Sequence, residues 1–259
     1  MIVETEKKRK IIAKDKVQDD FHQGVSYTQN NDLIEACYTM SLAEKRILML
    51  GISKINPIKP PIPNDIELST YNPEQPKPLF KSFQFDITVE EWLEHFPTEN
   101  PWRDMKKACD SLLTRYLTLK ESKSTVKMSW VDYVRYHDGE SSLTLRLGNE
   151  ITTKLSGLLE NFTRIKLLET KKLRSVYAIR LYEITQKWSS GLTILSLNEL
   201  RRIFDVESKY SKIYEFKRKV IEPAIKEVNL NSSKHIKVEY QKRGRKITHV
   251  KFFCSKKES

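Results

Sequence analysis

The hydrophobic and polar positions alternate most regularly in the C-terminal part of the chain. From about Lys212 to Asn229, apolar residues recur at intervals of three and four, which is the period of an amphipathic helix. Its predicted buried face consists of Ile213, Phe216, Val220, Ala224 and Val228. The opposite side carries Lys212, Glu215, Arg218, Lys219, Glu222 and Lys226. Lys217 falls nearer the apolar side, and Pro223 is expected to kink the helix or to end its regular part.

A short helix is predicted ahead of this basic helix. Ser196 and Glu199 have the spacing of a capping box, in which each side chain bonds the backbone amide of the other residue. The helix that starts there carries Leu197, Leu200, Ile203 and Phe204 at helical spacing. It is expected to end in a break from about Asp205 to Ser211.

Two alternating segments follow the basic helix. Ile236, Val238 and Tyr240, and then Thr248, Val250 and Phe252, alternate with polar residues as half-buried strands do. Between them, Gly244 supplies the backbone freedom of a tight turn and is flanked by Lys242, Arg243, Arg245 and Lys246. A basic hairpin tip is usually only solvated surface, but the order helix, basic helix, hairpin is typical of a DNA-reading winged helix.

A related pattern appears 108 positions earlier. Thr88 and Glu91 repeat the capping-box spacing and precede Trp92, Leu93 and Phe96. In each copy a predicted long helix and then a predicted strand precede the short helix. In the first copy the helix spans Asp32 to Ile55 and the strand Ser82 to Ile87. In the second copy the helix spans Leu173 to Trp188 and the strand Leu192 to Leu195.

The first copy continues with a helix that we expect to begin at Asn100 and Pro101, a capping residue followed by proline in the first helical position. Its predicted core stripe is Trp102, Met105, Cys109, Leu112 and Tyr116, and Arg103 and Lys107 project away from it. Strands are predicted over 116–121, 126–136 and 142–147, and a helical segment from about Asn149 to Leu168 would join the two copies.

The sequence therefore predicts an α+β fold of two tandem winged-helix domains related by pseudo-symmetry. We expect the N-terminal domain over residues 27–148 and the C-terminal domain over 149–259. A chance alignment of two capping boxes is the competing explanation.

The charge distribution assigns the DNA surface to the second domain. Residues 160–259 contain 24 Lys and Arg against 11 Asp and Glu, whereas the rest of the chain contains 22 against 23. A charge that served solubility alone would be spread along the chain, whereas a phosphate-binding surface concentrates it.

The remaining composition indicates a soluble, cytoplasmic protein. The chain has no run of eighteen apolar residues and no apolar stretch of a signal peptide near its start. Cys37, Cys109 and Cys254 lack zinc-site spacing, and the first two fall on predicted helices as core thiols. Residues 1–26 are expected to be a flexible arm. Residues 57–78 hold seven of the ten prolines and are expected to form a long loop.

Several segments together resemble the replication initiator (Rep) proteins of iteron-containing, theta-replicating plasmids. They are Asn31 to Ala36, Ser41 to Arg46, the Tyr-Ala-Ile-Arg-Leu-Tyr-Glu stretch Tyr177 to Glu183, Glu215 to Lys219, Pro223 to Ile225 and Gly244 to Lys246. They occur in the right order from about Asn30 to Phe253, and Tyr177 to Glu183 is the strongest single element. Taken alone, that stretch is an ordinary amphipathic helix.

The resemblance implies two pseudo-symmetric winged helices that bind DNA. Monomers of that family bind directly repeated origin sequences, and dimers, formed mainly through the N-terminal domain, commonly repress the initiator's own gene. By motif position, Lys217, Arg218 and Lys219 would lie on the C-terminal recognition helix and Arg243, Arg245 and Lys246 on its wing. Lys212 near the helix start is a further expected DNA contact. Tyr210 and Tyr214 in the same place could reach sugar or phosphate, and packing is an equal alternative for both. Host replication proteins are the other expected partners.

Enzymatic classes fit the sequence less well. A rolling-circle initiator would need a His-hydrophobic-His metal pair, which the five histidines do not form, and an ATP-driven helicase would need a glycine-rich phosphate loop, which the seven glycines do not form. We therefore expect a non-enzymatic initiator without cofactor or metal. The alternative is a transcriptional regulator with the same two winged helices and no replication role.

Overall fold

The computed structural model of the chain describes residues 26–58 and 82–257, apart from the single positions 122, 138, 159 and 189. The predicted arm over 1–26 and the proline-rich segment 57–78 lie almost entirely outside the described residues. None of the helices in the described ranges has the length and apolar character needed to cross a bilayer.

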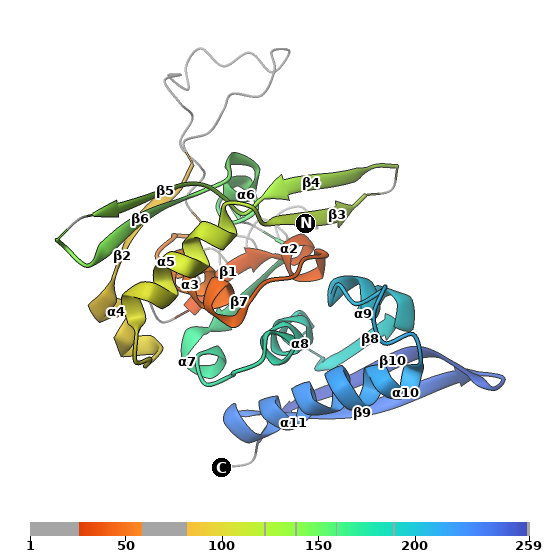
Figure 1. The fold of residues 1–259 in the computed structure, drawn as a ribbon. Helices are drawn as coiled ribbons and strands as arrows, with labels where there is room; N and C mark the ends of the chain where they lie inside the picture. The colour runs from red at the N-terminus through yellow and green to blue at the C-terminus, as the bar shows by residue number, and fades with distance from the viewer. Residues whose placement is uncertain are drawn as a thin grey trace, which may run out of the picture.

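The second module has the order of elements that the sequence predicts (Figure 1). Its elements are α8 (Val176–Gln186), β8 (Leu192–Ser196), α9 (Leu197–Ile203), α10 (Ile213–Phe216), α11 (Glu222–Asn231), β9 (Lys234–Arg243) and β10 (Lys246–Lys256). The strands form an antiparallel sheet in the order β8-β10-β9. Phe216, Val220, Ala224 and Val228 of the helical segment are buried, as are Ile236, Val250 and Phe252 of the sheet.

The first module repeats this topology. It consists of α3 (Leu42–Ile52), β2 (Gln84–Thr88), α4 (Val89–His95), α5 (Pro101–Leu112), β5 (Val131–His137) and β6 (Ser142–Leu147), with strand order β2-β6-β5. In both sheets the last strand of the module lies in the middle. A hairpin of β3 (Tyr116–Lys120) and β4 (Thr125–Ser129) is inserted between α5 and β5. Two winged helices in tandem are thus confirmed.

Each module also begins with a strand and a short helix, and the two strands pair with each other. β1 (Ser26–Asn30) leads into α2 (Asn31–Glu35), and β7 (Phe162–Lys166) leads into α7 (Leu167–Thr170). They run antiparallel with their middle residues, Thr28 and Arg164, opposite each other. This antiparallel pairing fits the pseudo-symmetry that the sequence predicts, and the pair lies between the two modules in Figure 1.

The predicted helical connection from Asn149 to Leu168 is therefore wrong. Of the described residues in that segment, only α6 (Asn149–Thr153) and the start of α7 are helical. Between them, Thr163 and Ile165 are buried alternately in β7, which is strand periodicity and fits the pairing with β1. The predicted division between residues 148 and 149 stays a prediction.

The predicted long helix from Asp32 to Ile55 is also wrong, because it is split into α2 and α3. Ser41 and Glu44 form a complete capping box, which starts a new helix at Leu42. Cys37, predicted to be helical, instead forms an isolated antiparallel bridge with Thr118 of β3. The later counterpart, predicted over 173–188, is a single helix, α8, that is shorter at both ends.

Two further details of the first module differ from the prediction. The strand predicted over 126–136 is divided into β4 and β5, because Trp130 turns inward, is buried and meets the Tyr38 ring edge-on at 5.1 Å. The capping box at Thr88 is only half formed: Thr88 accepts a bond from the Glu91 amide, but the Glu91 carboxylate pairs with Lys54 at 2.6 Å. Asn100 occupies the N-cap position of α5 without a side-chain bond.

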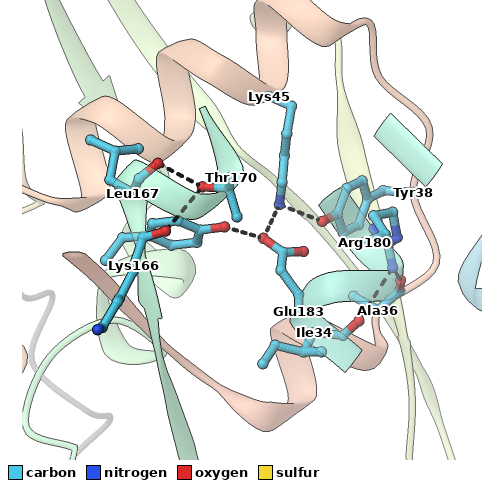
Figure 2. Close-up of polar contacts among 10 residues, drawn as sticks. Ile34, Ala36, Tyr38, Lys45, Lys166, Leu167, Thr170, Arg180 and Glu183 are labelled. Carbon is cyan, nitrogen blue, oxygen red and sulfur yellow. Dashed lines mark hydrogen bonds and ion pairs between the residues drawn. The ribbon is translucent and has the colours of Figure 1, made fainter. Parts of the chain in front are cut away.

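A buried polar cluster joins the two modules (Figure 2). The ammonium of Lys45 in α3 lies 2.7 Å from Glu183 Oε1 in α8, and it also donates to the Tyr38 hydroxyl at 3.0 Å. Tyr27 of β1 donates to the same Glu183 oxygen at 2.9 Å. Burial alone would lower the pKa of Lys45, but Glu183 and Tyr38 together outweigh burial and hold that pKa above its usual value. Lys45 therefore stays charged inside the protein.

Arg180, one turn before Glu183, completes this junction. Its Nη2 donates to the carbonyl oxygens of Ile34 at 3.3 Å and Ala36 at 2.7 Å, at the C-terminal end of α2. Its guanidinium also lies 3.6 Å from the centroid of the Tyr38 ring. These bonds occupy carbonyls that a continuous helix would have used, so α8 of the second module fixes the break between α2 and α3.

We expect Lys45→Met to lower the free energy of unfolding by about 3–5 kcal/mol, because it leaves the Glu183 carboxylate buried without its counter-charge. The double variant Lys45→Met/Glu183→Leu should recover much of that loss. Urea unfolding followed by circular dichroism measures both. Lys154→Met, which removes a partly exposed pair with Asp32, is the control and should cost at most about 1 kcal/mol. A double variant as unstable as Lys45→Met would show that packing, not charge, carries the cost.

Candidate nucleic-acid interface

The short helix α9 has the capping box that the sequence predicts. Ser196 N donates to Glu199 Oε2 at 2.8 Å, and Glu199 N donates to Ser196 Oγ at 3.1 Å. The bond from the Ser196 amide is the main cause that lowers the pKa of Glu199, so the carboxylate stays ionised at the positive end of the helix. The start of α9 is thereby fixed.

The turn from α9 to α10 is constrained by Arg201. Its guanidinium donates to the carbonyl oxygens of Lys209 at 3.2 Å and Ser211 at 3.4 Å, and it lies 4.7 Å from the centroid of the Phe216 ring. Within the same turn, Asp205 and Tyr210 have positive φ angles of 52° and 53°, which non-glycine residues rarely adopt. Such strained residues cluster where a structure must aim a functional element. Here the strained turn leads directly into the basic helix.

The basic helix is a composite, and we refer to Ile213–Asn231 as the recognition helix. α10 is followed by a π turn, Lys217–Ile221, and then by α11. Pro223 has no amide to donate and sits in the first turn of α11, directly after the π turn, so the helix continues through the proline to Asn231. The sequence predicted a kink or an end of the regular helix at Pro223, and the structure has a change of helix type just before it.

The structure places most of the predicted helix residues at the surface. Lys212, Tyr214, Arg218 and Lys219 are exposed. Lys217 is half-buried, as its position near the apolar side predicts. Within the described residues, Arg218 forms no ion pair with Glu215 or Glu222; Glu222 instead faces Lys217 at 3.9 Å. The Arg218 side chain is therefore not engaged by a carboxylate of its own helix.

The three consecutive cations Lys217, Arg218 and Lys219 each lie over a tyrosine ring. Lys217 is 4.1 Å from the centroid of Tyr240, Arg218 is 5.4 Å from that of Tyr214, and Lys219 is 5.6 Å from that of Tyr210. Cation–π contacts at such distances orient a side chain without neutralising its charge. Tyr214 is therefore positioned as a support for Arg218.

The wing extends beyond the body of the second module (Figure 1). Arg243 pairs with Lys246 across a two-residue turn, in which Gly244 has a φ of +61° as the first central residue of a type II′ turn requires. Lys242, Arg243, Arg245 and Lys246 are all exposed. The hairpin thus presents four cations at the same end of the module as α10.

The first module carries less charge at the equivalent places. Arg103 is 71% exposed on α5 and pairs with its neighbour Asp104 at 3.1 Å, and Lys107 is exposed one turn later. The turn between β5 and β6 presents Gly139 and Glu140 instead of cations in its described part. In Figure 1, α5 and the recognition helix both lie on the viewer's side of their sheets. The two helices are thus on one side of the molecule.

Sequence reasoning did not identify the residues that hold these surfaces in place. Arg201, Tyr240 and the Lys45–Glu183 pair emerge only from contacts across elements. The Tyr177 to Glu183 stretch was the one signal available, and there Arg180 and Glu183 are buried polar residues on a helix that is otherwise largely apolar.

Comparison with known proteins agrees with this geometry. A protein of Escherichia coli described as a replication initiation protein is 23% identical over 223 residues, which cover 83% of this chain and 65% of that protein. An uncharacterised 27.6 kDa protein of Escherichia coli is 24% identical over 214 residues, covering 79% of this chain and 85% of that one. The solved structure of the Pi initiator protein in complex with iteron DNA has a TM-score of 0.71 at 19% identity, covering 92% of this chain and all of that one. That likeness shows the same fold.

The fold and the basic surface together define a DNA-binding protein with two winged helices. Residues 26–186 match the family described as "Initiator Replication protein, WH1", and residues 196–254 match "Initiator Rep protein, WH2". Because the matches cover most of the chain, it belongs to the replication initiator (Rep) protein family.

Proposed function

We propose that this chain starts plasmid replication by binding directly repeated origin sequences, the iterons, as double-stranded DNA. The observation that carries the proposal is the exposed Arg218, which forms no ion pair with Glu215 or Glu222 of its own helix, beside a projecting wing with four cations. The similarity in fold to an initiator solved on iteron DNA supports it. The proposal includes a cytoplasmic location, the recruitment of host replication proteins, and a dimer in equilibrium with the monomer that represses the initiator's own gene.

The proposed contacts divide by chemistry. Arg218 can bond the guanine edge in two places, because its planar guanidinium presents paired donors. The point charges Lys212 and Lys219, with Tyr214 beside them, suit phosphate and sugar. Arg243, Arg245 and Lys246 of the wing, and Arg103 and Lys107 of the first module, supply further backbone contacts. Lys217 lies at the edge of this surface.

We further propose that the chain acts without catalysing a reaction. Purified protein supplied with Mg²⁺ or Mn²⁺ and ATP should neither nick supercoiled plasmid DNA nor hydrolyse the nucleotide, because the sequence contains neither a His-hydrophobic-His pair nor a glycine-rich phosphate loop. Agarose-gel and phosphate-release assays measure the two activities. A metal-dependent nick with a tyrosine covalently attached to DNA would overturn this part of the proposal.

Hydroxyl-radical footprinting on the DNA that flanks the gene tests the proposal as a whole. Two modules that read major-groove faces on the same side of the duplex, about 10.5 bp apart, should protect on the order of 20 bp per monomer in directly repeated sites. The variant Arg103→Ala/Lys107→Ala should lose protection at one end of each site. A footprint of only a single half-turn that the variant leaves unchanged would contradict the proposal. A single palindromic site, without direct repeats, would favour a transcriptional regulator.

Substitution of Arg218 tests the proposed division of contacts. Arg218→Ala should cost about 1–3 kcal/mol at the specific site while changing nonspecific binding little, because a base contact is lost. Lys246→Ala should weaken binding to all DNA similarly, because a phosphate contact is lost. The slope of the logarithm of the binding constant against the logarithm of the salt concentration (the salt slope) should then become smaller by about one. Binding to specific and scrambled duplexes at two salt concentrations separates the two roles. Equal losses on both duplexes for Arg218→Ala would identify it as a phosphate contact.

A further inference from the structure

The recognition helix is attached to strand β9 at two places. Toward the start of β9, the Asn229 side chain bonds both backbone groups of Ile236: its Nδ2 donates to the carbonyl oxygen at 2.9 Å, and its Oδ1 accepts from the amide at 2.7 Å. Toward the wing, the ammonium of Lys217 lies 4.1 Å from the centroid of the Tyr240 ring. The first attachment holds the base of the hairpin, and the second lies where the hairpin leaves the module.

Tyr240 is the last residue of β9 that packs against the body of the protein. Ile236, Val238 and Tyr240 share the core-facing side of the strand, and the next residue on that side, Lys242, is exposed. The Tyr240 hydroxyl is buried and has no hydrogen-bond partner among the described residues. Burial accordingly raises the pKa of Tyr240. The ring is thus held under the helix and does not reach out toward solvent.

The π turn directs Lys217 to this ring. Lys217 is its first residue, and its carbonyl accepts the amide of Glu222, five residues later. Because residues five apart lie on nearly the same side of a π turn, the Lys217 ammonium comes within 3.9 Å of Glu222 Oε1. The Lys217 side chain is only 29% exposed, whereas its neighbours Arg218 and Lys219 are exposed. Of these three consecutive cations, Lys217 therefore points toward strand β9, whereas Arg218 and Lys219 face solvent.

We propose that Lys217 is a positioning residue that fixes the wing to the recognition helix through Tyr240, and that it does not bind phosphate. The consequence for DNA rests on the proposed function: Arg218 and the wing residues Arg243, Arg245 and Lys246 approach the duplex as one rigid unit. The ammonium is already engaged by an aromatic face and a carboxylate, so it has no need of a third, phosphate partner. Its loss frees the hairpin and raises the entropy that the wing loses on binding.

The mechanical link is tested on the free, full-length chain by amide hydrogen exchange. Lys217→Gln and Tyr240→Leu should each speed exchange in the ladder that flanks the wing tip, Gln241–Arg243 and Ile247–His249, whereas Tyr240→Phe keeps the aromatic face and should leave exchange unchanged. Lys219→Gln, which removes a cation over Tyr210 in the turn, is the matched control and should also leave it unchanged. Unchanged exchange in Lys217→Gln and Tyr240→Leu overturns the proposal whatever the DNA assays give.

The role in binding is tested on a duplex that the wild-type chain selects from a randomised library, with a scrambled duplex beside it. Lys217→Gln and Tyr240→Leu should each weaken the selected duplex by about threefold to thirtyfold, the double variant should lose no more than either single variant, and the salt slope should stay as in the wild type. Lys219→Gln should instead reduce the salt slope by about one. A reduced slope for Lys217→Gln, with equal losses on both duplexes, would make Lys217 a phosphate ligand and overturn the proposal. Failure of the wild type to select any sequence would count against the proposed function, and hydrogen exchange would still decide the link.

Discussion

The buried contact between Lys45 and Glu183 constrains how the two modules are placed, because it is made by two helices that belong to different modules. Removing a charge from water is unfavourable unless a partner and further hydrogen bonds compensate for it, and here Tyr27 and Tyr38 supply those bonds. These bonds form only when α3, α8 and β1 are all in place. We therefore expect the relative placement of the two winged helices to depend on this contact.

Arg180 also links the second module to the backbone of the first. Its bonds to the carbonyls of Ile34 and Ala36 stop the chain from continuing as a helix, and Ser41 then starts α3 in a new direction. The direction of α3 in turn sets where α5 lies, since the two helices pack together. A polar residue near the middle of the molecule thus affects the direction in which Arg103 and Lys107 are presented.

The sequence was sufficient where local chemistry decides the structure. The period of Phe216, Val220, Ala224 and Val228, the capping box at Ser196 and the glycine at the wing tip are local signals, and the structure confirms all three. It was insufficient where a distant residue competes with a local preference. Asp32 to Ile55 has helical periodicity, but Thr118 and Arg180 bond to its backbone and interrupt the helix. Residues 162–166 were predicted to be helical, but they form a strand because β1 offers an edge for pairing. The helical period did predict which cations of the recognition helix face outward. It could not predict the π turn at Lys217 or the contacts of that side chain with Tyr240 and Glu222, because these depend on packing against β9.

The pairing of β1 with β7 also has a consequence for the order in which the chain folds. Ser26 lies opposite Lys166, so β1, the first of the described strands, has no partner until the first module and the start of the second have been synthesised. Contacts between residues so far apart in sequence form late, because the intervening chain must first become ordered. In a vectorial synthesis that proceeds from the N-terminus, the first winged helix can form its own sheet early, but its N-terminal strand waits for the second. The junction between the modules is therefore expected to close last, and a nascent chain would carry a recognisable first module well before it has the geometry of the whole.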